Sequence, residues 1–438
     1  MYCVAQGPCY FISGTVFGVQ PLSDGWKTWT CRTELPPNFD CAALSVPTPH
    51  GRPIEIEFNF DNSVKIIIPG ETKLLIDGKD FVGPQELVLP SVRPDPSKTI
   101  DTRTIATWSQ PYRNWHYYPR FVVPPKPDIP GYKGIHMTDV PTVYQLPGEE
   151  NKNKWYMSFI GYDGNGYQSF VAESSDLVTW KHFRLAFGFG DEGEFDFGGR
   201  VLGGYLLESY EVNAPRTLKR LGGKFWCLYG AYSKRGGYEI DPGFEGVCVS
   251  EDGITWSRAV EHPILSVNDD DTKPWESGSI YQPWLLYHED KYYNFYNAKR
   301  MPEWLEQIGV ATSEDLVDWK RSIDNPVLKV MPGDFDSQFC SDPKVYRDGD
   351  HWVMFYFGLG NEGKASIMVA FSRDLSNWTK DRTPLYRAGV HPQGLDNQHA
   401  HKTSLVYNAS NKTYYLYYCA VGSKGRGISL VTSKAIGS

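Results

Sequence analysis

The chain has 438 residues, of which 41% are hydrophobic and 15% aromatic, and its formal net charge is −8. It contains no run of 18 or more apolar residues, so we expect neither a transmembrane helix nor a membrane partner. The mildly acidic balance also argues against nucleic acid as a partner. The length suffices for a large core, as two domains or as one large β architecture.

Residues 1–110 alternate apolar and polar side chains as strands do, in the segments RPIEIEFNF, SVKIIIPG, KLLIDG and ELVLP. We predict a β-rich region or small β domain there. The first residues lack the basic region and cleavage site of a secretory signal, which leaves a cytoplasmic chain or a mature secreted or periplasmic form open. The eight cysteines show no CxxC and no zinc-type spacing, so no metal site is predicted from them.

A motif of Ser, then Asp followed by Leu or Gly, then Trp occurs four times, ending at Trp180, Trp256, Trp319 and Trp378. Repeats of this period are typical of propellers. Ser and Asp suit a tight turn, and each Trp would pack between neighbouring repeats. An aromatic segment and a third apolar segment precede each motif. A fifth unit, from HAHKTSLVY to RGISLVTSK, lacks the Trp.

Each unit is predicted to begin with a strand that has a proline near its start. The five candidate strands are TDVPTVYQL, VNAPRTLKR, IYQPWLLYH, CSDPKVYRD and HAHKTSLVY. Five units of about four strands predict an all-β, five-bladed propeller over residues 111–438. Because a ring must cover its edges, we expect an N-terminal segment to supply the missing outer strand of the fifth blade, with residues 104–108 as the candidate.

The first strands should line the central channel, which places the polar residues around their prolines at its mouth. Asp139 and Asp342 stand directly before apolar strands, either as catalytic carboxylates or as turn caps. A second column of acids lies seven residues before the aligned position in blades two to five: Glu208, Glu276, Asp336 and Asp396. This column is either a structural device that closes a loop or, for Glu276, a catalytic group.

Carboxylates that converge in one channel fit the cleavage of glycosidic bonds. One acid must protonate the leaving oxygen, and a second carboxylate must attack the anomeric carbon or activate water. Crowding would raise the pKa of one acid and leave another low, which would set the two roles.

Several other residues near the predicted mouth could contact a substrate. His399 and His401 lie two apart and should point the same way on a strand, as rim hydrogen-bonding groups, sugar ligands, a general acid or ligands of a channel ion. Arg216, Lys344 and Lys402 could bind an anionic group or pair with the carboxylates. Glu211 lies near the same rim, and Trp284 could stack on a sugar or pack in the core.

The fivefold repeat, TDVPTVY, CSDPKVYRDGDHW and the S-x-D-L-x-x-W closures resemble the five-bladed propeller glycoside hydrolases of families 43, 32, 68, 117 and 130, over about residues 130–438. Resemblance to family 43 implies Asp139 as general base, with Glu276 and Asp342 as candidates for the acid and the pKa modulator. Resemblance to family 117 implies Asp139, Asp342 and His401. TDVPTV lacks the N-D-P-N-G-like pattern of family 32, and family 130 would require a phosphate pocket.

Together these features predict an exo-acting glycoside hydrolase that cleaves a plant or algal oligosaccharide or polysaccharide. Asp139 would be base or nucleophile, Glu276 the acid, and Asp342 a pKa modulator or alternative acid. The predicted substrate-binding residues are Glu211, Arg216, Trp284, His399, His401 and Lys402. The alternatives are a phosphate-dependent phosphorylase and a non-catalytic sugar-binding propeller. No organic cofactor is implied, although a structural cation in the channel would be compatible.

Overall fold

The computed structural model describes residues 20–21, 28–31, 42–46, 52–58, 63–70, 72–76, 79–90, 100–360 and 362–436. The chain divides into two compact units, Met1–Thr99 and Ile100–Ser438. The boundary that we expected at residue 110 therefore lies earlier, because helix α2 (Thr102–Ser109) belongs to the second unit. No helix within the described ranges is long and apolar enough to cross a membrane.

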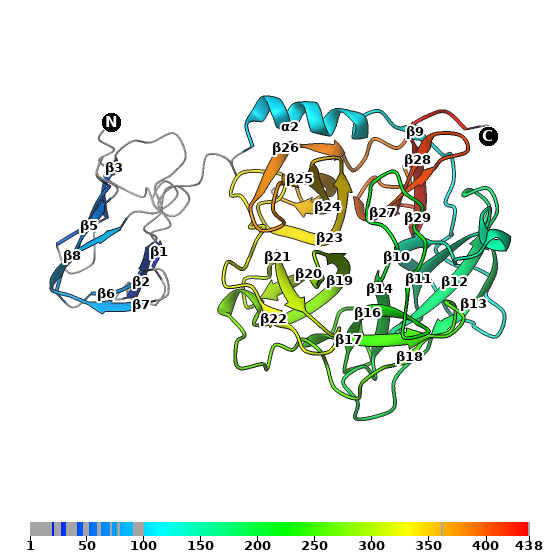
Figure 1. The fold of residues 1–438 in the computed structure, drawn as a ribbon, viewed down its shortest axis with the longest axis horizontal. Coiled ribbons are helices and arrows are strands. Elements are labelled where there is room, and N and C mark those ends of the chain that lie inside the picture. Colours follow the sequence, from blue (N-terminus) through cyan, green and yellow to red (C-terminus); the bar gives the residue numbers. More distant parts are fainter. Residues whose placement is uncertain are drawn as a thin grey trace. The chain divides into compact units, whose positions relative to one another are not determined.

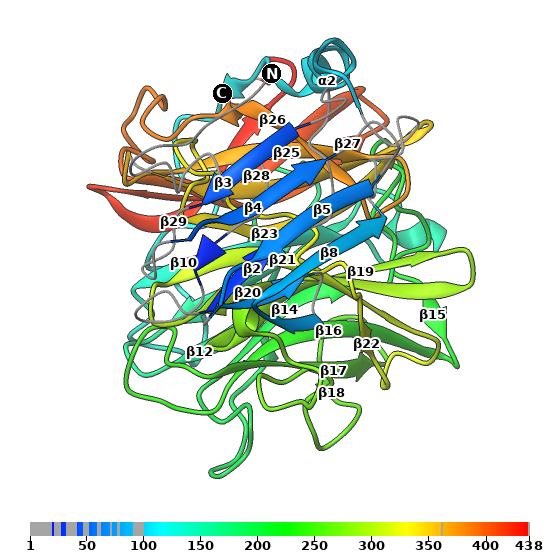
Figure 2. The same ribbon diagram turned by 90° about the vertical axis from the view of Figure 1, so that its left-hand side faces the viewer.

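The first unit consists of β-strands, as predicted. One sheet has the order β3-β4-β5-β8, and these strands lie side by side in Figure 2. The other has the order β1-β2-β6-β7. Alternating residues of β4, β5 and β6 form a small core that includes Ile56, Ile66 and Leu74, which explains the period-two pattern of their sequences. The bounds are β1 Gln20–Pro21, β2 Thr28–Cys31, β3 Ala42–Val46, β4 Ile54–Phe58, β5 Ser63–Ile68, β6 Lys73–Ile76, β7 Lys79–Val82 and β8 Gln85–Pro90.

The second unit is a five-bladed propeller, and Figure 1 shows the first strand of each blade gathered around its centre. Blade one contains β10 (Met137–Tyr144), β11 (Trp155–Tyr162), β12 (Tyr167–Ser174) and β13 (Lys181–Phe187). Blade two contains β14 (Gly199–Tyr205), β16 (Lys224–Tyr232), β17 (Gly243–Ser250) and β18 (Ser257–Arg258), with β15 (Arg220–Leu221) beside β16.

Blades three to five repeat the same order of strands. Blade three contains β19 (Ser279–His288), β20 (Lys291–Arg300), β21 (Leu305–Ser313) and β22 (Lys320–Arg321). Blade four contains β23 (Phe339–Asp348), β24 (His351–Leu359), β25 (Ala365–Ser372) and β26 (Trp378–Tyr386). Blade five contains β27 (His399–Asn408), β28 (Thr413–Gly422), β29 (Gly425–Thr432) and, from far upstream, β9 (His116–Tyr117).

The ring closes through an N-terminal strand, but not through the segment that we expected. β9 pairs antiparallel with β29, whereas residues 104–108 lie in α2. The Asp101 carboxylate caps this helix by accepting hydrogen bonds from the backbone N–H groups of Arg103 and Thr104. Its Trp108 then stacks on His351 with ring centroids 3.8 Å apart. Capping and this stacking outweigh the strand propensity of the TIATW segment.

The first strand of blade two also differs from the prediction, which placed it at VNAPRTLKR. The strand is β14, GRVLGGY, and its Gly203 and Gly204 run against blade three. A Cβ at Gly204 would lie 2.9 Å from the backbone nitrogen of Leu285, so the close approach requires glycine. These glycines replace the proline of the other blades, which is why alignment on the proline failed here.

The repeated turn motif has the hydrogen bonds that its residues suggest. Ser174 Oγ accepts from the backbone N–H of Leu177, and Asp176 Oδ1 accepts from those of Val178 and Thr179. The same bonds recur in the other three motifs, at Ser250–Thr255, Ser313–Asp318 and Ser372–Asn377. The Ser-Asp pair therefore closes the turn into the outer strand, as predicted.

Candidate active site

An extra residue near the start of each first strand aims side chains toward the channel. Every first strand shifts register against its neighbour at this point. In four blades a residue of the bulge has a left-handed backbone: Val140, Gln282, Asp342 and Lys402, with φ of 51°, 59°, 57° and 54°. A bulge re-aims neighbouring side chains, and non-glycine residues adopt this conformation at a cost of about 1 kcal/mol or more.

Asp139 lies at the centre of a buried ionic cluster. Its Oδ2 contacts the guanidinium of Arg426 and lies 3.1 Å from Lys402 Nζ, and its Oδ1 accepts a hydrogen bond from the backbone N–H of Val140. His401 Nδ1 lies 4.0 Å away. Burial alone would raise the pKa of Asp139, but the charges of Arg426, Lys402 and His401 hold that pKa well below its usual range. Asp139 is therefore a permanently ionised carboxylate.

Two further carboxylates belong to this cluster. Glu239, in the loop between β16 and β17, has its Oε1 3.6 Å from Lys402 Nζ. Because Asp139 contacts the same ammonium at 3.1 Å, the nearest oxygens of the two carboxylates are at most about 7 Å apart. Glu306, on β21, is only 3% exposed. Burial, followed by the nearby charge of Glu239, raises the pKa of Glu306.

These two glutamates were missed by sequence reasoning, as was Arg426. The prediction considered only the first strands, whereas Glu239 is in a loop, Glu306 begins a third strand and Arg426 lies near the start of β29. The available signal was a charged residue inside an otherwise apolar third strand, as in LEQIGVATS and GRGISLVT. Such a residue needs a partner when it is buried, which is a reason to expect a polar site.

The structure brings His401 and Lys402 to this cluster, and His399 lies nearby. The rings of His399 and His401 are 6.1 Å apart on β27, as expected for residues two apart on a strand. His399 Nδ1 accepts the backbone N–H of Ala365, whereas His401 Nδ1 has no hydrogen-bond partner among the described residues. Burial lowers the pKa of both imidazoles, so both are neutral hydrogen-bonding groups at neutral pH.

Asp342 is buried on β23 and paired with a neighbour on its own strand. Its Oδ1 lies 2.8 Å from Lys344 Nζ, and both side chains are buried. Its Oδ2 accepts no hydrogen bond within the described part of the chain. Asp342 thus has one oxygen left for a ligand, while the adjacent Ser341 hydroxyl hydrogen-bonds Glu306 and lowers its pKa.

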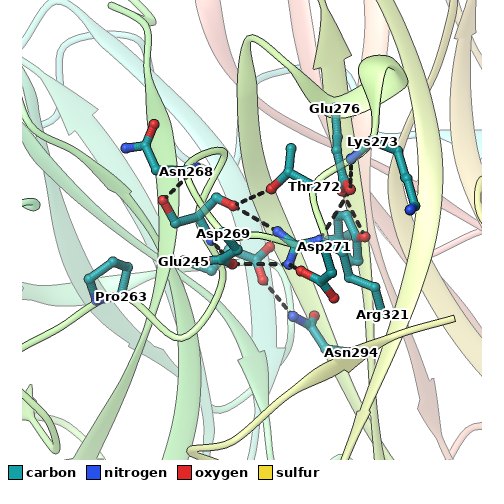
Figure 3. A network of polar contacts seen from close by, with 12 residues as sticks. Glu245, Pro263, Asn268, Asp269, Asp271, Thr272, Lys273, Glu276, Asn294 and Arg321 are labelled. Atoms are coloured by element: carbon teal, nitrogen blue, oxygen red, sulfur yellow. Dashed lines mark hydrogen bonds and ion pairs between the residues drawn. The ribbon is translucent and has the colours of Figure 1, made fainter.

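Glu276 lies elsewhere, in a network of polar contacts that Figure 3 shows from close by. It ends the short 3-10 helix η3 (Pro274–Glu276), and its Oε1 accepts the backbone N–H of Lys273 and pairs with Arg321 Nε at 3.1 Å. Arg321 also pairs with Asp269 and Asp271. All of Glu276 is buried, with its carboxylate committed to these partners.

The contacts of Glu276 recur in other blades. The Tyr296 hydroxyl donates to Glu276 at 3.0 Å, and each of three buried aspartates accepts from a tyrosine of a second strand. These pairs are Asp196–Tyr229, Asp336–Tyr356 and Asp396–Tyr418. In blade two the acid is Asp196 rather than Glu208. The acid column is therefore a structural device of the blades, and the assignment of Glu276 as the general acid is withdrawn.

Arg216 and Glu211 do not reach Asp139 either. Arg216 is 2% exposed and donates hydrogen bonds to the carbonyls of Glu211, Val212 and Leu405. Leu405 lies four residues beyond His401 on β27, or about 13 Å farther along the strand. Glu211 pairs through its backbone with Arg347, near the far end of β23. Both residues therefore belong to the opposite end of the channel, and the predicted contact with substrate at the Asp139 mouth is wrong.

Trp284 packs inside the propeller. It is 4% exposed, its indole N–H donates to the carbonyl of Val345 at 2.9 Å, and its ring contacts that of Tyr346 edge-on. No face of this tryptophan is open to a sugar. The packing alternative is confirmed for Trp284.

One group of described residues has the spacing of metal ligands. Asp139, His401 and Cys419 place their ligand atoms within 4.8 Å of one another. Arg426 and Lys402 already contact the same Asp139 carboxylate, and a cation there would be repelled by both. The residues fit an anion-neutralising cluster better than a cation site.

Comparison with known proteins agrees with this arrangement. The family model "Glycosyl hydrolases family 32 N-terminal domain" matches residues 208–393. A solved structure described as "Glycoside hydrolase" is 27% identical, with a TM-score of 0.68 over 77% of this chain and 97% of that chain. The protein is a five-bladed β-propeller glycoside hydrolase. No protein with a curated description matches it.

Other solved structures resemble this glycoside hydrolase. One described as a BT0996 complex with RGII is 28% identical, with a TM-score of 0.66 over 76% of this chain and 96% of that chain. The fold is also shared with Zg3597, a family 117 glycoside hydrolase from Zobellia galactanivorans, at 12% identity and a TM-score of 0.51 over 73% and 90% of the two chains. The hydrolase segment matched by the family model includes Glu239 and Glu306.

Proposed function

We propose that the hydrolase is exo-acting and removes a terminal sugar from a plant or algal oligosaccharide, with Glu306 as general acid and Glu239 as its partner carboxylate. The observation that carries this proposal is the coupling of the two glutamates. Glu306 is a buried acid whose pKa is raised by burial and by Glu239, while Glu239 faces the ammonium of Lys402. A protonated acid beside an ionised carboxylate is the pair that glycoside cleavage needs.

In this mechanism Glu306 gives its proton to the glycosidic oxygen as the bond to the anomeric carbon breaks. The leaving sugar departs as an alcohol, and the positive charge that develops on the terminal sugar is stabilised by Glu239. Glu239 then either bonds to the anomeric carbon or takes a proton from the attacking water. Lys402 holds Glu239 in place, because its ammonium is itself anchored by Asp139.

Asp139 has a different role here from the one that its sequence position suggested. It is fully buried, and Arg426, Lys402 and the Val140 N–H already occupy its oxygens. An attacking group must reach the anomeric carbon, whereas Asp139 is committed to its partners. We therefore assign Asp139 as the anion that positions Lys402 and Arg426, in place of base or nucleophile.

Exo action is supported by the burial of the cluster. Glu306, His401 and Lys402 are all buried, so the end of a sugar chain can approach them more readily than its middle. A plant or algal substrate is supported by the 28% identical structure, which is described as a complex with RGII. RGII and oligosaccharides released from it are therefore the first substrates to test.

The test is hydrolysis of RGII, of oligosaccharides released from it, of other plant and algal oligosaccharides and of aryl glycosides, with and without inorganic phosphate. We expect a free monosaccharide without phosphate. Glu239→Gln should lose activity on every substrate. Glu306→Gln should lose it on oligosaccharides but retain most of it on aryl glycosides with good leaving groups, which need no proton. Equal losses for the two variants on all substrates would contradict the assigned roles.

The same experiment separates hydrolysis from phosphorolysis. A phosphorylase would need a basic pocket, for which Arg216, Lys344 and Lys402 were the candidates. They make different contacts: Arg216 binds backbone carbonyls, Lys344 pairs with Asp342, and Lys402 pairs with Asp139 and Glu239. Release of a sugar phosphate only in the presence of phosphate would nevertheless replace the hydrolytic proposal.

A further inference from the structure

We propose that Trp304 is the platform on which the leaving-group sugar of an oligosaccharide binds, and that the same side chain orients Glu306. This inference rests on the proposed function, in which Glu306 protonates the oxygen of that leaving sugar. It concerns a tryptophan that stands apart from the repeated Trp motifs and follows the second strand of blade three.

Trp304 is bonded directly to the proposed acid. Its indole Nε1 donates a hydrogen bond of 2.9 Å to Glu306 Oε1. This bond leaves the second oxygen, Oε2, as the position from which Glu306 would donate its proton. A group that fixes one oxygen of a carboxyl group also fixes the direction of the other, which is the orientation that proton transfer requires.

Trp304 is also exposed, unlike the packing tryptophans Trp180, Trp256 and Trp284. It keeps 41% of its surface accessible although it touches a buried carboxyl group. An exposed aromatic ring beside a buried acid offers apolar surface where the substrate must lie. Because the acid faces the glycosidic oxygen, the sugar that packs on this ring is the one on the leaving side of the bond.

The ring is held in position by its neighbours. Lys299 Nζ lies 4.2 Å from the Trp304 ring centroid, and Phe339 packs at 5.6 Å between centroids. The Trp304 backbone has φ of 49°, a left-handed conformation that costs a non-glycine residue about 1 kcal/mol or more. Strain of this kind persists where the surrounding structure fixes a side chain, which fits a preformed binding surface.

Contacts also link Trp304 to the loop that carries Glu239. The ammonium of Lys299 pairs with Asp241 at 2.9 Å, two residues beyond Glu239. Asp241 in turn accepts a hydrogen bond from Ser279 Oγ at the start of β19. A sugar packed on Trp304 would therefore contact a residue that adjoins both proposed catalytic carboxylates, one directly and one through Lys299 and Asp241.

Two variants separate the platform from the hydrogen bond. Trp304→Ala removes both, and Trp304→Phe keeps an aromatic ring without the N–H. For the panel oligosaccharide that the enzyme hydrolyses fastest, Trp304→Ala should raise KM by about tenfold or more, the range expected for a buried aromatic contact. On the glycosyl fluoride of the same terminal sugar, which has no leaving sugar, KM should change less than about twofold.

Trp304→Phe should keep KM for the oligosaccharide within about threefold but lower kcat and move the alkaline limb of its pH profile upward. The indole N–H favours the ionised form of Glu306, so its loss keeps the acid protonated to higher pH. Leu221→Ala, which alters a similarly exposed side chain on β15, is the matched control and should change neither parameter.

The outcomes distinguish this inference from the proposed function. If the oligosaccharides are hydrolysed and Trp304→Ala leaves KM unchanged, the platform is wrong and the function stands. If none is hydrolysed, titration of the whole panel by tryptophan fluorescence decides. Binding by the wild type that Trp304→Ala weakens would support the platform without the function, and binding that is absent or insensitive to Trp304 would overturn the platform as well.

Discussion

Two buried clusters of carboxylates and cations lie in the propeller, and they differ in one respect. The cluster of Asp139, Glu239 and Glu306 is built from residues of several blades and has no counterpart elsewhere in the described part of the repeat. The cluster of Glu276 and Arg321 in Figure 3 contains an acid–tyrosine pair that recurs in three other blades. Burial and charge alone therefore do not identify a catalytic group in a propeller. Repetition indicates structure, and departure from the repeat indicates function.

The largest contrast is expected between Glu306→Gln and Glu276→Gln. Loss of the acid at Glu306 should lower kcat/KM on an oligosaccharide by about 10²–10⁴-fold with little change in melting temperature. Glu276→Gln should leave kcat/KM per folded molecule within about threefold, but it should lower the free energy of unfolding by about 2 kcal/mol or more because Arg321 loses a buried partner. Kinetics and denaturant unfolding on both variants measure the contrast, which reversed effects would invert.

The same contrast has a pH dependence. Only protonated Glu306 can donate a proton, so kcat for oligosaccharides should fall as the pH rises through its raised pKa. The limb should disappear in Glu306→Gln measured on a glycosyl fluoride, and it should persist in Glu276→Gln. A limb that survives in Glu306→Gln would assign the titration to another group.

The two ends of the channel should also respond differently. Arg216→Met removes the donor to the carbonyls of Glu211, Val212 and Leu405 at the end away from Asp139. We expect a loss of about 2–4 kcal/mol in the free energy of unfolding, because buried carbonyls are left without donors. KM should not change in the folded fraction. An increase in KM of tenfold without destabilisation would return Arg216 to the substrate site.

Within the structural cluster, Glu245 should make stability depend on pH. Burial raises its pKa to about 8, against an ordinary value of 4.5. Between these values the unfolded chain releases the proton and the folded chain keeps it, so wild-type stability should fall as the pH rises from about 4.5 to 8. Glu245→Gln, which mimics the neutral acid, should match the wild type at pH 4.5 and melt several degrees higher at pH 8. Thermal melts across this range measure the difference, and parallel curves would contradict it.

The smallest effect is expected at Trp284. Trp284→Phe keeps an aromatic ring but removes the hydrogen bond to Val345 and leaves a small cavity, at a cost of about 1–2 kcal/mol. Activity should be unchanged, in contrast to Trp304→Ala. Chemical denaturation and the KM of the best oligosaccharide, measured on both variants, compare the packing tryptophan with the proposed platform.

The course of the strands followed from the sequence because local pattern and fold agreed there. The aromatic second strands, the alternating third strands and the Ser-Asp turns occupy the predicted segments. The two errors have local causes. Blade two uses glycines where the others use a proline, because Gly204 meets the backbone of Leu285. The TIATW segment forms a helix because Asp101 caps it.

The candidate site was predictable only in part. Asp139, His401 and Lys402 could be found because they lie on the first strands, whose position in a propeller follows from the repeat. Glu239 and Glu306 could not be selected among the 52 acidic residues by type alone. Their partners come from other blades, and a contact such as Lys402 with Glu239 joins residues far apart in the chain.

The sequence by itself determined the five-bladed repeat, the turns and the first-strand residues, since these depend on short-range patterns of apolar side chains, proline and turn formers. Only the tertiary structure decided which carboxylates meet. Closing the ring brings blade five against blade one, so that Lys402 and Arg426 neutralise Asp139 while Glu276 is committed to Arg321. Charges in a buried site act through distance and burial, and neither quantity is written in the order of the residues.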